Sequence, residues 1–321
     1  MTYKIIKYQP EYQSVWDDFI TRSANGTFLH KRDYMDYHAH RFKDFSLMVF
    51  DEKNLKAVLP AHQRANDIYA HKGLTYSDFI FLPGTRTAQR RDMLQQALAY
   101  LNQAGFQKLL LQNIPFVFHT HPNDINTYLY FQLRAKIYQI KPFFIIPGDD
   151  FRLNKDRKNN LKKLHEKDYE ILDSIDYLPE FWHIVQKNLQ EKHQSKPVHS
   201  FEEISLLASR FPVNIRLFTL HQKGVVTSGA LLYVFPHTLH FQYIHSDPQV
   251  KNPGVDNLIA YVVEKYKNEY KYISLGTSEK GNNLLSKGLA YWKESFGAVI
   301  FNQFFFEISL ENHYVLNNLL Q

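Results

Sequence analysis

The sequence predicts an α/β protein of the α+β type, built from two tandem copies of one unit. Each copy is expected to be a mixed, mainly antiparallel sheet flanked by helices. Two observations support this: one order of strands and helices occurs twice with similar spacing, and 321 residues with 44% hydrophobic side chains suffice for two cores. We therefore expect one domain at residues 1–146 and a second at 149–321.

The first copy has the order strand, two helices, three strands, helix, strand. These elements are expected at residues 3–8, 12–21, 31–41, 45–50, 56–64, 67–72, 89–103 and 108–112. The polar run Asp51-Glu52-Lys53-Asn54 supplies a turn between two strands. Gly105 follows the long helix, where glycine is the residue that most readily ends a helix.

The second copy repeats the order and adds a last helix and strand. Its elements are expected at residues 169–172, 179–191, 201–210, 215–220, 225–235, 238–246, 256–270 and 272–275, then a helix, then 299–308. Ser200 and Glu203 form a capping box at a helix start. In the later helix, apolar residues from Leu258 to Tyr266 recur at helical spacing and predict one face packed on a sheet. Residues 147–150 are the expected linker between the copies.

Composition excludes several classes of protein. With no cysteine, the chain has no disulfide, no thiolate metal site and no cysteine nucleophile. The first residues have no apolar signal core, and no uncharged apolar run approaches the ~20 residues that span a bilayer. We expect a cytoplasmic protein without membrane insertion. A net charge of +6 is weak evidence for nucleic acid.

Familiar catalytic motifs are missing. The sequence has no G-x-S-x-G elbow, no G-x-G-x-x-G and no H-E-x-x-H. The segment Gly276–Gly281 has the two glycines of a phosphate loop, but Asn282 and Asn283 stand where lysine and serine or threonine are required. No histidine pair has the spacing of a metal site, so no metal is expected.

The distinctive segment is Gly276-Thr-Ser-Glu-Lys-Gly-Asn-Asn-Leu-Leu-Ser-Lys-Gly-Leu-Ala-Tyr-Trp-Lys-Glu-Ser-Phe-Gly297, a strand end, a glycine-punctuated loop and a helix leading to the last strand. It resembles the signature of the FemAB-like branch of the GNAT acyltransferase superfamily, whose members carry two tandem GNAT domains. The stretches Phe241–Ile244, Asn25–His30 and Gly73–Tyr76 are also similar to that branch.

The resemblance implies an N-acyltransferase, acetyltransferase-like, that moves an acyl group from acyl-CoA to an amine. Lys293 matches the family lysine that stabilises the oxyanion, although a lysine at a helix C-terminus is also favoured by the helix dipole. The coenzyme A loop would include Lys251, Gly254 and Val255. This loop departs from the family pattern, because Pro253 removes an amide donor.

Further candidate site residues are identified by their places on one strand and one loop of the second copy. Tyr243 and His245 alternate on one strand and share a face, so Tyr243 is a candidate acid and His245 a candidate base, with a packing role as the alternative. His193 and His199 flank a loop near Pro197 and are candidate substrate contacts.

Two more groups are candidates for substrate binding. Glu279 would hold the amine acceptor or cap the following helix. Arg157 and Lys158 belong to the basic stretch 152–167, which would bind phosphates or form a solvated helix face.

Two other functions remain open. In the first, the enzyme transfers an aminoacyl group from aminoacyl-tRNA to a peptidoglycan precursor. The mild net charge and the lack of an inserted helical arm favour acyl-CoA as the donor instead. From a different class, the chain would be a non-catalytic GNAT-like protein that binds an anionic ligand, which the altered phosphate loop supports.

Overall fold

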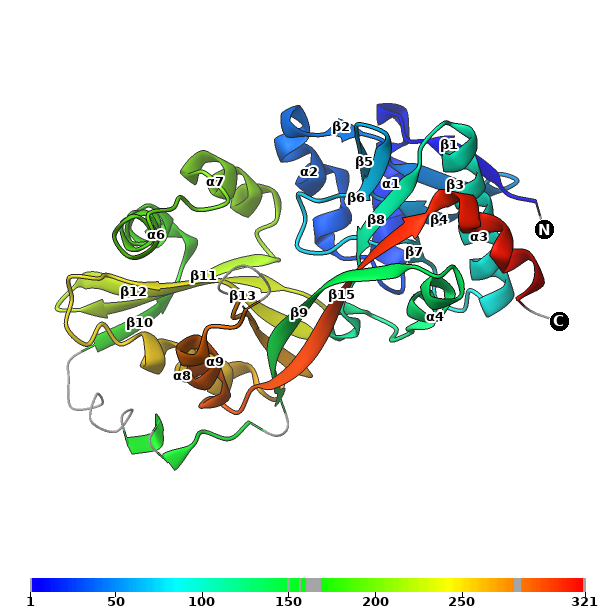
Figure 1. Ribbon diagram of the computed structural model, residues 1–321. Coiled ribbons are helices and arrows are strands. Elements are labelled where there is room, and N and C mark those ends of the chain that lie inside the picture. Colours follow the sequence, from blue (N-terminus) through cyan, green and yellow to red (C-terminus); the bar gives the residue numbers. More distant parts are fainter. Residues whose placement is uncertain (1, 149–150, 156, 160–168, 280–283, 320–321) are drawn as a thin grey trace. The chain divides into compact units, whose positions relative to one another are not determined.

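The computed structural model describes residues 2–148, 151–155, 157–159, 169–279 and 284–319. The chain divides into two compact units, Met1–Lys141 with Asn302–Gln321, and Pro142–Phe301 (Figure 1). Each unit combines a mixed sheet with helices, so the expected α/β class with two tandem domains is confirmed. Among these described residues, no helix has both the length and the apolar character needed to cross a membrane.

The elements of the first unit follow the expected order. They are β1 (Lys4–Lys7), α1 (Gln13–Arg22), α2 (Arg32–Met35), η3 (Asp36–Arg41), β2 (Lys43–Asp44), β3 (Leu47–Asp51), β4 (Asn54–Leu59), β5 (Ala61–Arg64), β6 (Asp67–Ala70), β7 (Ile80–Phe81), α3 (Thr87–Gln103), β8 (Lys108–Gln112), α4 (Ile125–Gln132), part of β9 (Lys136–Pro147), part of β15 (Val299–Ser309) and η7 (Leu310–Asn318).

Two groups of strands form the sheets of this unit. Strands β1, β3, β4 and β7 pair in that order, and β15, β8, β6, β5 and β2 pair in a second series. Within the second series, β6 and β8 are parallel, and the other pairs described are antiparallel. Helix α3 contributes Met93, Leu94 and Leu98 to a core that also takes Leu310 and Leu316 from η7.

The expected single strand at residues 56–64 is wrong. It is two strands, β4 and β5, which lie in different sheets. Pro60 stands between them, and proline has no N–H to continue a ladder. The sequence analysis did not predict β7, α4 or β9. Strand β7 and helix α4 are short, and β9 lacks a regular alternation of polar and apolar residues.

The second unit contains a six-stranded series of neighbours, β10-β11-β12-β13-β14-β9. Its elements are β10 (Tyr169–Asp173), α6 (Leu178–His193), α7 (Phe201–Arg210), β11 (Ile215–Gln222), β12 (Val225–Val234), β13 (Thr238–Ser246), α8 (Val255–Tyr266), β14 (Tyr272–Thr277) and α9 (Lys287–Glu294), with parts of β9 and β15. All these pairs are antiparallel except β13 with β14.

Helices cover both faces of this sheet (Figure 1). On one face, α8 buries Leu258, Ile259 and Val262 against Phe218 and Leu232, as its helical spacing predicts. On the other face, the ring of Phe181 in α6 lies so close to the backbone of Gly229 that a Cβ there would be 2.3 Å from it. The glycine therefore lets the helix approach the sheet.

Strands β9 and β15 each contribute residues to both units. Pro147 pairs with Tyr272, and the Gly148 amide donates to the Lys271 carbonyl, so the expected linker region begins inside the second unit's sheet. Residues of β15 from Phe305 onward pair with β8 in the first unit. The domain limits 1–146 and 149–321 stay a prediction about which residues fold together.

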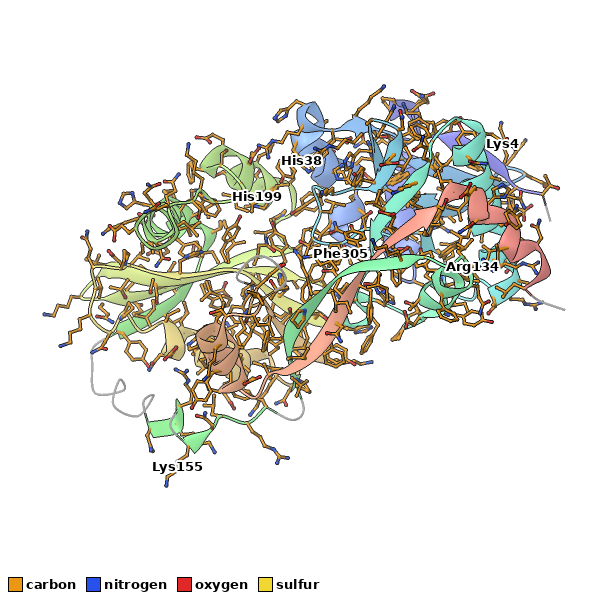
Figure 2. All side chains as sticks on the ribbon, viewed as in Figure 1. Lys4, His38, Arg134, Lys155, His199 and Phe305 are labelled. Carbon is orange, nitrogen blue, oxygen red and sulfur yellow. The ribbon has the colours of Figure 1, made fainter. Side chains whose placement is uncertain are left out.

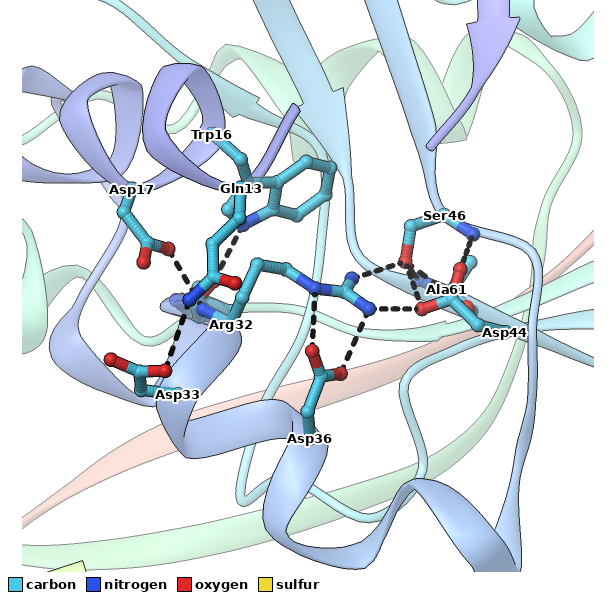
Figure 3. A network of polar contacts seen from close by, with 10 residues as sticks. Gln13, Trp16, Asp17, Arg32, Asp33, Asp36, Asp44, Ser46 and Ala61 are labelled. Atoms are coloured by element: carbon cyan, nitrogen blue, oxygen red, sulfur yellow. Dashed lines mark hydrogen bonds and ion pairs between the residues drawn. The ribbon is translucent and has the colours of Figure 1, made fainter. Parts of the chain in front are cut away.

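A buried arginine organises the start of the first unit (Figure 3). The Arg32 side chain is 3% exposed and forms ion pairs with Asp36 at 2.8 Å and Asp44 at 2.7 Å. Its guanidinium lies 3.8 Å from the centre of the Tyr8 ring. Because a buried cation is costly without partners, these contacts tie α2 to β2 and to Tyr8, the residue that follows β1.

Three histidine rings pack together behind this arginine. The rings of His38 and His71 are 5.2 Å apart, and those of His62 and His71 are 5.6 Å apart. Burial, followed by the neighbouring His38, lowers the pKa of His71 well below its ordinary value, and burial, followed by Lys72, lowers the pKa of His62 to about 4. The rings of His62 and His71 are therefore neutral in the folded protein at neutral pH.

This cluster predicts a loss of stability in acid. The unfolded chain binds protons near pH 6.5 while the folded histidines stay neutral, so the free energy of unfolding falls as pH drops from 6.5 toward 4. The melting temperature measured across that range is expected to fall less steeply for His71→Phe than for the wild type. The exposed His121 provides a control, His121→Phe, which should follow the wild type. Parallel curves for all three proteins would contradict the prediction.

Candidate functional site

The candidate site lies where two parallel strands separate. Strands β13 and β14 pair at Thr238–Tyr272, Leu239–Ile273 and His240–Ser274, and among the described residues the pairing stops there. Strand β13 continues to Ser246 along β12, while β14 continues along β9, where Thr277 pairs with Phe143. Within the described parts of the chain, neither strand has a further strand partner on its inner edge beyond this point.

Irregular backbone on both strands coincides with the separation. In β13 the register shifts so that Gln242 has no partner opposite it in β12, which is a β-bulge. In β14 the register shifts after Ser274, and Gly276 adopts φ +71°, a conformation that favours glycine. The Ser274 hydroxyl holds this turn by accepting from the Gly276 amide at 3.3 Å, and it lies 2.9 Å from Nδ1 of His240.

Lys293 stands on the β14 side of the opening. It belongs to α9, is 4% exposed, and its Nζ donates to the carbonyl of Thr277. The same nitrogen lies 5.4 Å from the centre of the Phe144 ring. The last turn of α9 therefore points its lysine inward, which differs from a lysine on the helix surface.

The surroundings change the protonation of this lysine. Burial lowers the pKa of Lys293 to about 7, so it exchanges its proton near neutral pH. Burial, with a smaller contribution from the charge of Lys293, lowers the pKa of His240 to about 4 and keeps that ring neutral. A titrating cation in an apolar wall is able to stabilise a developing negative charge.

Tyr243 and His199 meet on the β13 side. Tyr243 lies three residues beyond the last pair on β13, as Thr277 does on β14. The Tyr243 hydroxyl is 2.7 Å from Nδ1 of His199, and both side chains are buried. The Trp182 ring of α6 packs edge-on against Tyr243 at 5.0 Å and holds it in place. The structure thus joins two residues that the sequence suggested separately.

His245 lies one residue pair farther along the same face. Its Nδ1 is 3.3 Å from Oδ1 of Asn188 in α6, and Asn188 in turn donates to the carbonyl of Ser246 at 2.9 Å. The Tyr243 and His245 rings are 6.3 Å apart, so these side chains share one wall, as their alternation predicts. Figure 2 marks His199 on the segment between α6 and α7.

The loop expected to bind coenzyme A leads into α8. Gly254 adopts φ +80° just before the helix, and its α-carbon packs against Leu220 so closely that a Cβ would lie 2.8 Å from that side chain. Val255 is the first residue of α8, whose start has no side-chain cap, and Lys251 is exposed. A helix start of this kind presents amide donors suited to an anion.

The remaining predicted residues have different surroundings. Arg157 is buried in an ion pair with Asp256, with its guanidinium 4.5 Å from the Phe296 ring, so it fastens the segment 151–157 to α8 and α9. Lys158 is exposed, and Glu279 is half-buried in an isolated bridge with Leu285. His193 ends α6, but its side chain lies outside the described part of the structure, as do residues 160–168 of the basic stretch.

The corresponding opening of the first unit is filled by its own chain. Strands β6 and β8 are parallel up to Tyr69–Leu110, and beyond that point the Ser77 amide donates to the Gln112 carbonyl at 2.9 Å. The Gln112 side chain donates to the Leu74 carbonyl at 2.7 Å. The family-like stretch Gly73–Tyr76 therefore has a structural role in this unit, whereas in the described part of the second unit no strand is seen to fill the corresponding place.

Sequence reasoning missed several members of the site. His240 and Ser274 were not singled out, because each lies in an apolar strand pattern that predicts packing. Trp182 and Asn188 lie on successive turns of α6, and only contact with β13 reveals their position. The short polar interruption of apolar strands at His240 and Ser274 was the one available signal.

Comparisons with solved structures identify the fold. FemX superposes with a TM-score of 0.69 at 10% identity, over 98% of this chain and 99% of that one. The C-terminal domain of a putative lysylphosphatidylglycerol synthetase from Agrobacterium fabrum superposes with a TM-score of 0.60 at 11% identity, covering 96% of each chain.

A tandem GNAT protein from the clavulanic acid biosynthesis pathway has a TM-score of 0.52 at 10% identity, over 96% of this chain and 99% of that one. No protein-family model matches the chain, and no curated protein matches it in sequence. The chain therefore has a FemAB-like fold of two GNAT-type domains, as the resemblance implied.

Burial of Lys293 predicts a pH-dependent gain in stability when it is replaced by Met. In the unfolded chain the lysine keeps its proton to about pH 10.5, whereas in the folded chain its pKa is about 7, so the cost of burying the charge is full at pH 6 and disappears as pH rises toward 10. Lys293→Met is expected to raise the melting temperature at pH 6 by about 10 °C, because lowering the pKa from 10.5 to about 7 corresponds to ~5 kcal/mol and ~1 kcal/mol shifts a domain of this size by 2–4 °C.

The gain should shrink by pH 9, as measured by calorimetry of both proteins at each pH. Replacing the exposed Lys287 of the same helix by Met is the matched control and should give no such trend. A constant difference across the pH range would show that the folded and unfolded chains bind the same number of protons, so that folding does not lower the pKa of Lys293.

Proposed function

We propose that this chain is an N-acyltransferase that moves an acyl group from acyl-CoA to a primary amine. The observation that carries the proposal is the opening between β13 and β14, with buried Lys293 at one strand and the Tyr243–His199 pair at the other. An extended donor with amide groups, such as the pantetheine arm of coenzyme A, is able to pair with an open strand edge.

The residues present support direct transfer. The amine nitrogen attacks the thioester carbon, and the oxygen gains negative charge that protonated Lys293 stabilises. The carbon–sulfur bond then breaks, and Tyr243 donates its hydroxyl proton to the leaving sulfur. His199, hydrogen-bonded to Tyr243, returns a proton to the Tyr243 oxygen. The amine gives its proton to solvent or to His245, so an amide and a free thiol are the products.

The donor is argued from charge. A net charge of +6 and exposed lysines at positions 155, 158 and 251 suit a ligand with a few phosphates. Aminoacyl-tRNA is the second candidate, because Lys155 and Lys158 belong to a basic stretch that would contact a nucleic-acid backbone. Figure 2 shows Lys155 at the outer edge of the second unit.

Activity is tested by release of free thiol from acyl-CoA in the presence of amines. The absence of cysteine makes a thiol reagent usable without background from the protein. Lys293→Ala is expected to lower turnover about one hundred- to one thousand-fold, the usual cost of losing an oxyanion donor. Tyr243→Phe keeps the ring and should also lower turnover, by roughly one hundred-fold.

Lys287→Ala, on the exposed side of α9, is the control and should keep wild-type turnover. Wild-type rates for folded Lys293→Ala would remove the lysine from the mechanism. If no thiol is released with any amine while ligands still bind, the non-catalytic alternative gains support.

A salt series separates the two donors. Binding of tRNA should weaken steeply as salt rises, since many phosphate contacts release many counterions, whereas binding of acyl-CoA should change little. We expect the shallow slope, measured as donor affinity across the series. Lys155→Glu with Lys158→Glu tests the basic segment, and the exposed Lys4→Glu in the first unit is the matched control.

Tight tRNA binding that is lost with salt and with Lys155→Glu/Lys158→Glu, but retained in Lys4→Glu, would overturn the choice of acyl-CoA. That result would assign aminoacyl transfer to the same opening.

A further inference from the structure

A cavity of about 430 Å³ lies in the second unit, along the flank of α8. Small-molecule sites commonly have volumes of this order. It is lined by Phe151, Leu153, Tyr169, Asn257, Ala260, Tyr261, Glu264 and Lys265. None of these residues belongs to the opening between β13 and β14, so the cavity is a second feature of the unit.

The lining of the cavity combines aromatic rings with a buried side-chain amide. Phe151, Tyr169 and Tyr261 supply three aromatic rings. Asn257 is 4% exposed, and its Oδ1 has no hydrogen-bond partner among the described residues. Its Nδ2 makes only a long contact, 3.4 Å, to the Tyr169 hydroxyl. A buried amide in this state favours a ligand that donates to its oxygen.

The charged residues of the lining are already paired within the chain. Glu264 forms an ion pair with Lys267 at 2.6 Å, and Lys265 lies 3.6 Å from a carboxylate oxygen of Asp173. The part of a ligand inside the cavity is therefore neutral. An aromatic ring that carries an N–H donor next to a ring-nitrogen acceptor fits both this condition and the two-sided amide of Asn257.

Positive charge is found just outside the cavity. On the segment that forms one wall, Phe151 and Leu153 line the cavity while Arg152 and Lys155 are exposed. The Arg157–Asp256 ion pair fixes this segment to the first turn of α8. Asn257 lies in that same turn, next to the uncapped amides at the helix start. A ligand with a neutral ring inside the cavity and phosphates outside matches this distribution of charge.

We propose that this cavity binds the adenine base of an adenosine nucleotide, with the amide of Asn257 on the base edge and the phosphates along the basic segment. Side-chain amides recognise adenine because it presents an amino donor beside a ring-nitrogen acceptor. Guanine presents donors on its pairing edge, which would need a free carboxylate, and Glu264 is engaged by Lys267. The inference rests on the proposed function, since coenzyme A and the 3′ end of aminoacyl-tRNA both contain adenosine.

The test is direct binding to the full chain without turnover. AMP, GMP and adenosine 3′,5′-bisphosphate are titrated by calorimetry against the wild type, Asn257→Leu and Tyr261→Ala. The Tyr261 side chain is 43% exposed, so its removal spares the core. We expect AMP to bind at least about tenfold more tightly than GMP, and each variant to weaken AMP about tenfold or more, the usual effect of losing one base-stacking ring.

Tyr314→Ala, an exposed tyrosine of the first unit, is the matched control and should leave AMP affinity unchanged. Competition then distinguishes the two sources of adenosine. Displacement of AMP by coenzyme A identifies a thioester donor, and displacement by a CCA-ended RNA hairpin identifies a tRNA donor. Either result supports the adenine site.

The inference is overturned if AMP does not bind, if GMP binds equally well, or if AMP affinity is the same in both cavity variants. The fate of the proposed function is separate. Lys293-dependent thiol release without an AMP effect leaves the acyltransferase standing and removes the adenine site. AMP binding that depends on Tyr261, in a protein without transferase activity, does the reverse.

Discussion

The organisation of the second unit depends on where one pair of parallel strands stops pairing. At His240 and Ser274 the two strands are still paired. Beyond them, at a bulge at Gln242 and a left-handed glycine at position 276, they part, and β13 stays with β12 while β14 stays with β9. Lys293, Tyr243 and His199 all lie beside this divergence. The backbone irregularity is thus what creates a place for chemistry in an otherwise continuous sheet.

The site is built at the expense of stability. A lysine whose ammonium is removed from water raises the free energy of the folded state whenever it is protonated, and its one hydrogen-bond acceptor named above is a backbone carbonyl. Arg157 differs from this lysine, because it forms an ion pair with Asp256 and its guanidinium packs against the ring of Phe296. The contrast separates a cation that fastens the fold from one that is kept available for a reacting group.

The sequence was sufficient for most regular elements of the second unit. The helix Phe201–Arg210 and the strand Thr238–Ser246 have the expected limits, because capping at Ser200 and the turn at Pro236 are local signals. In the first unit, local reasoning failed at Pro60, where a break between sheets depends on distant strands. The same limit applies to the site. The contact between His199 and Tyr243 joins residues far apart in the chain, and no spacing rule reveals it.

The path of strand β15 has a consequence for how the protein is made. The segment Asn302–Gln321 completes the first unit. It supplies the part of β15 that pairs with β8, and the core residues Leu310 and Leu316. A growing chain emerges from the ribosome in order, and domains tend to fold as they appear. Here the first unit is completed only when Asn302–Gln321 has been made, which is after residues 142–301. Until then β8 presents an unpaired apolar edge, which is the kind of surface that chaperones bind.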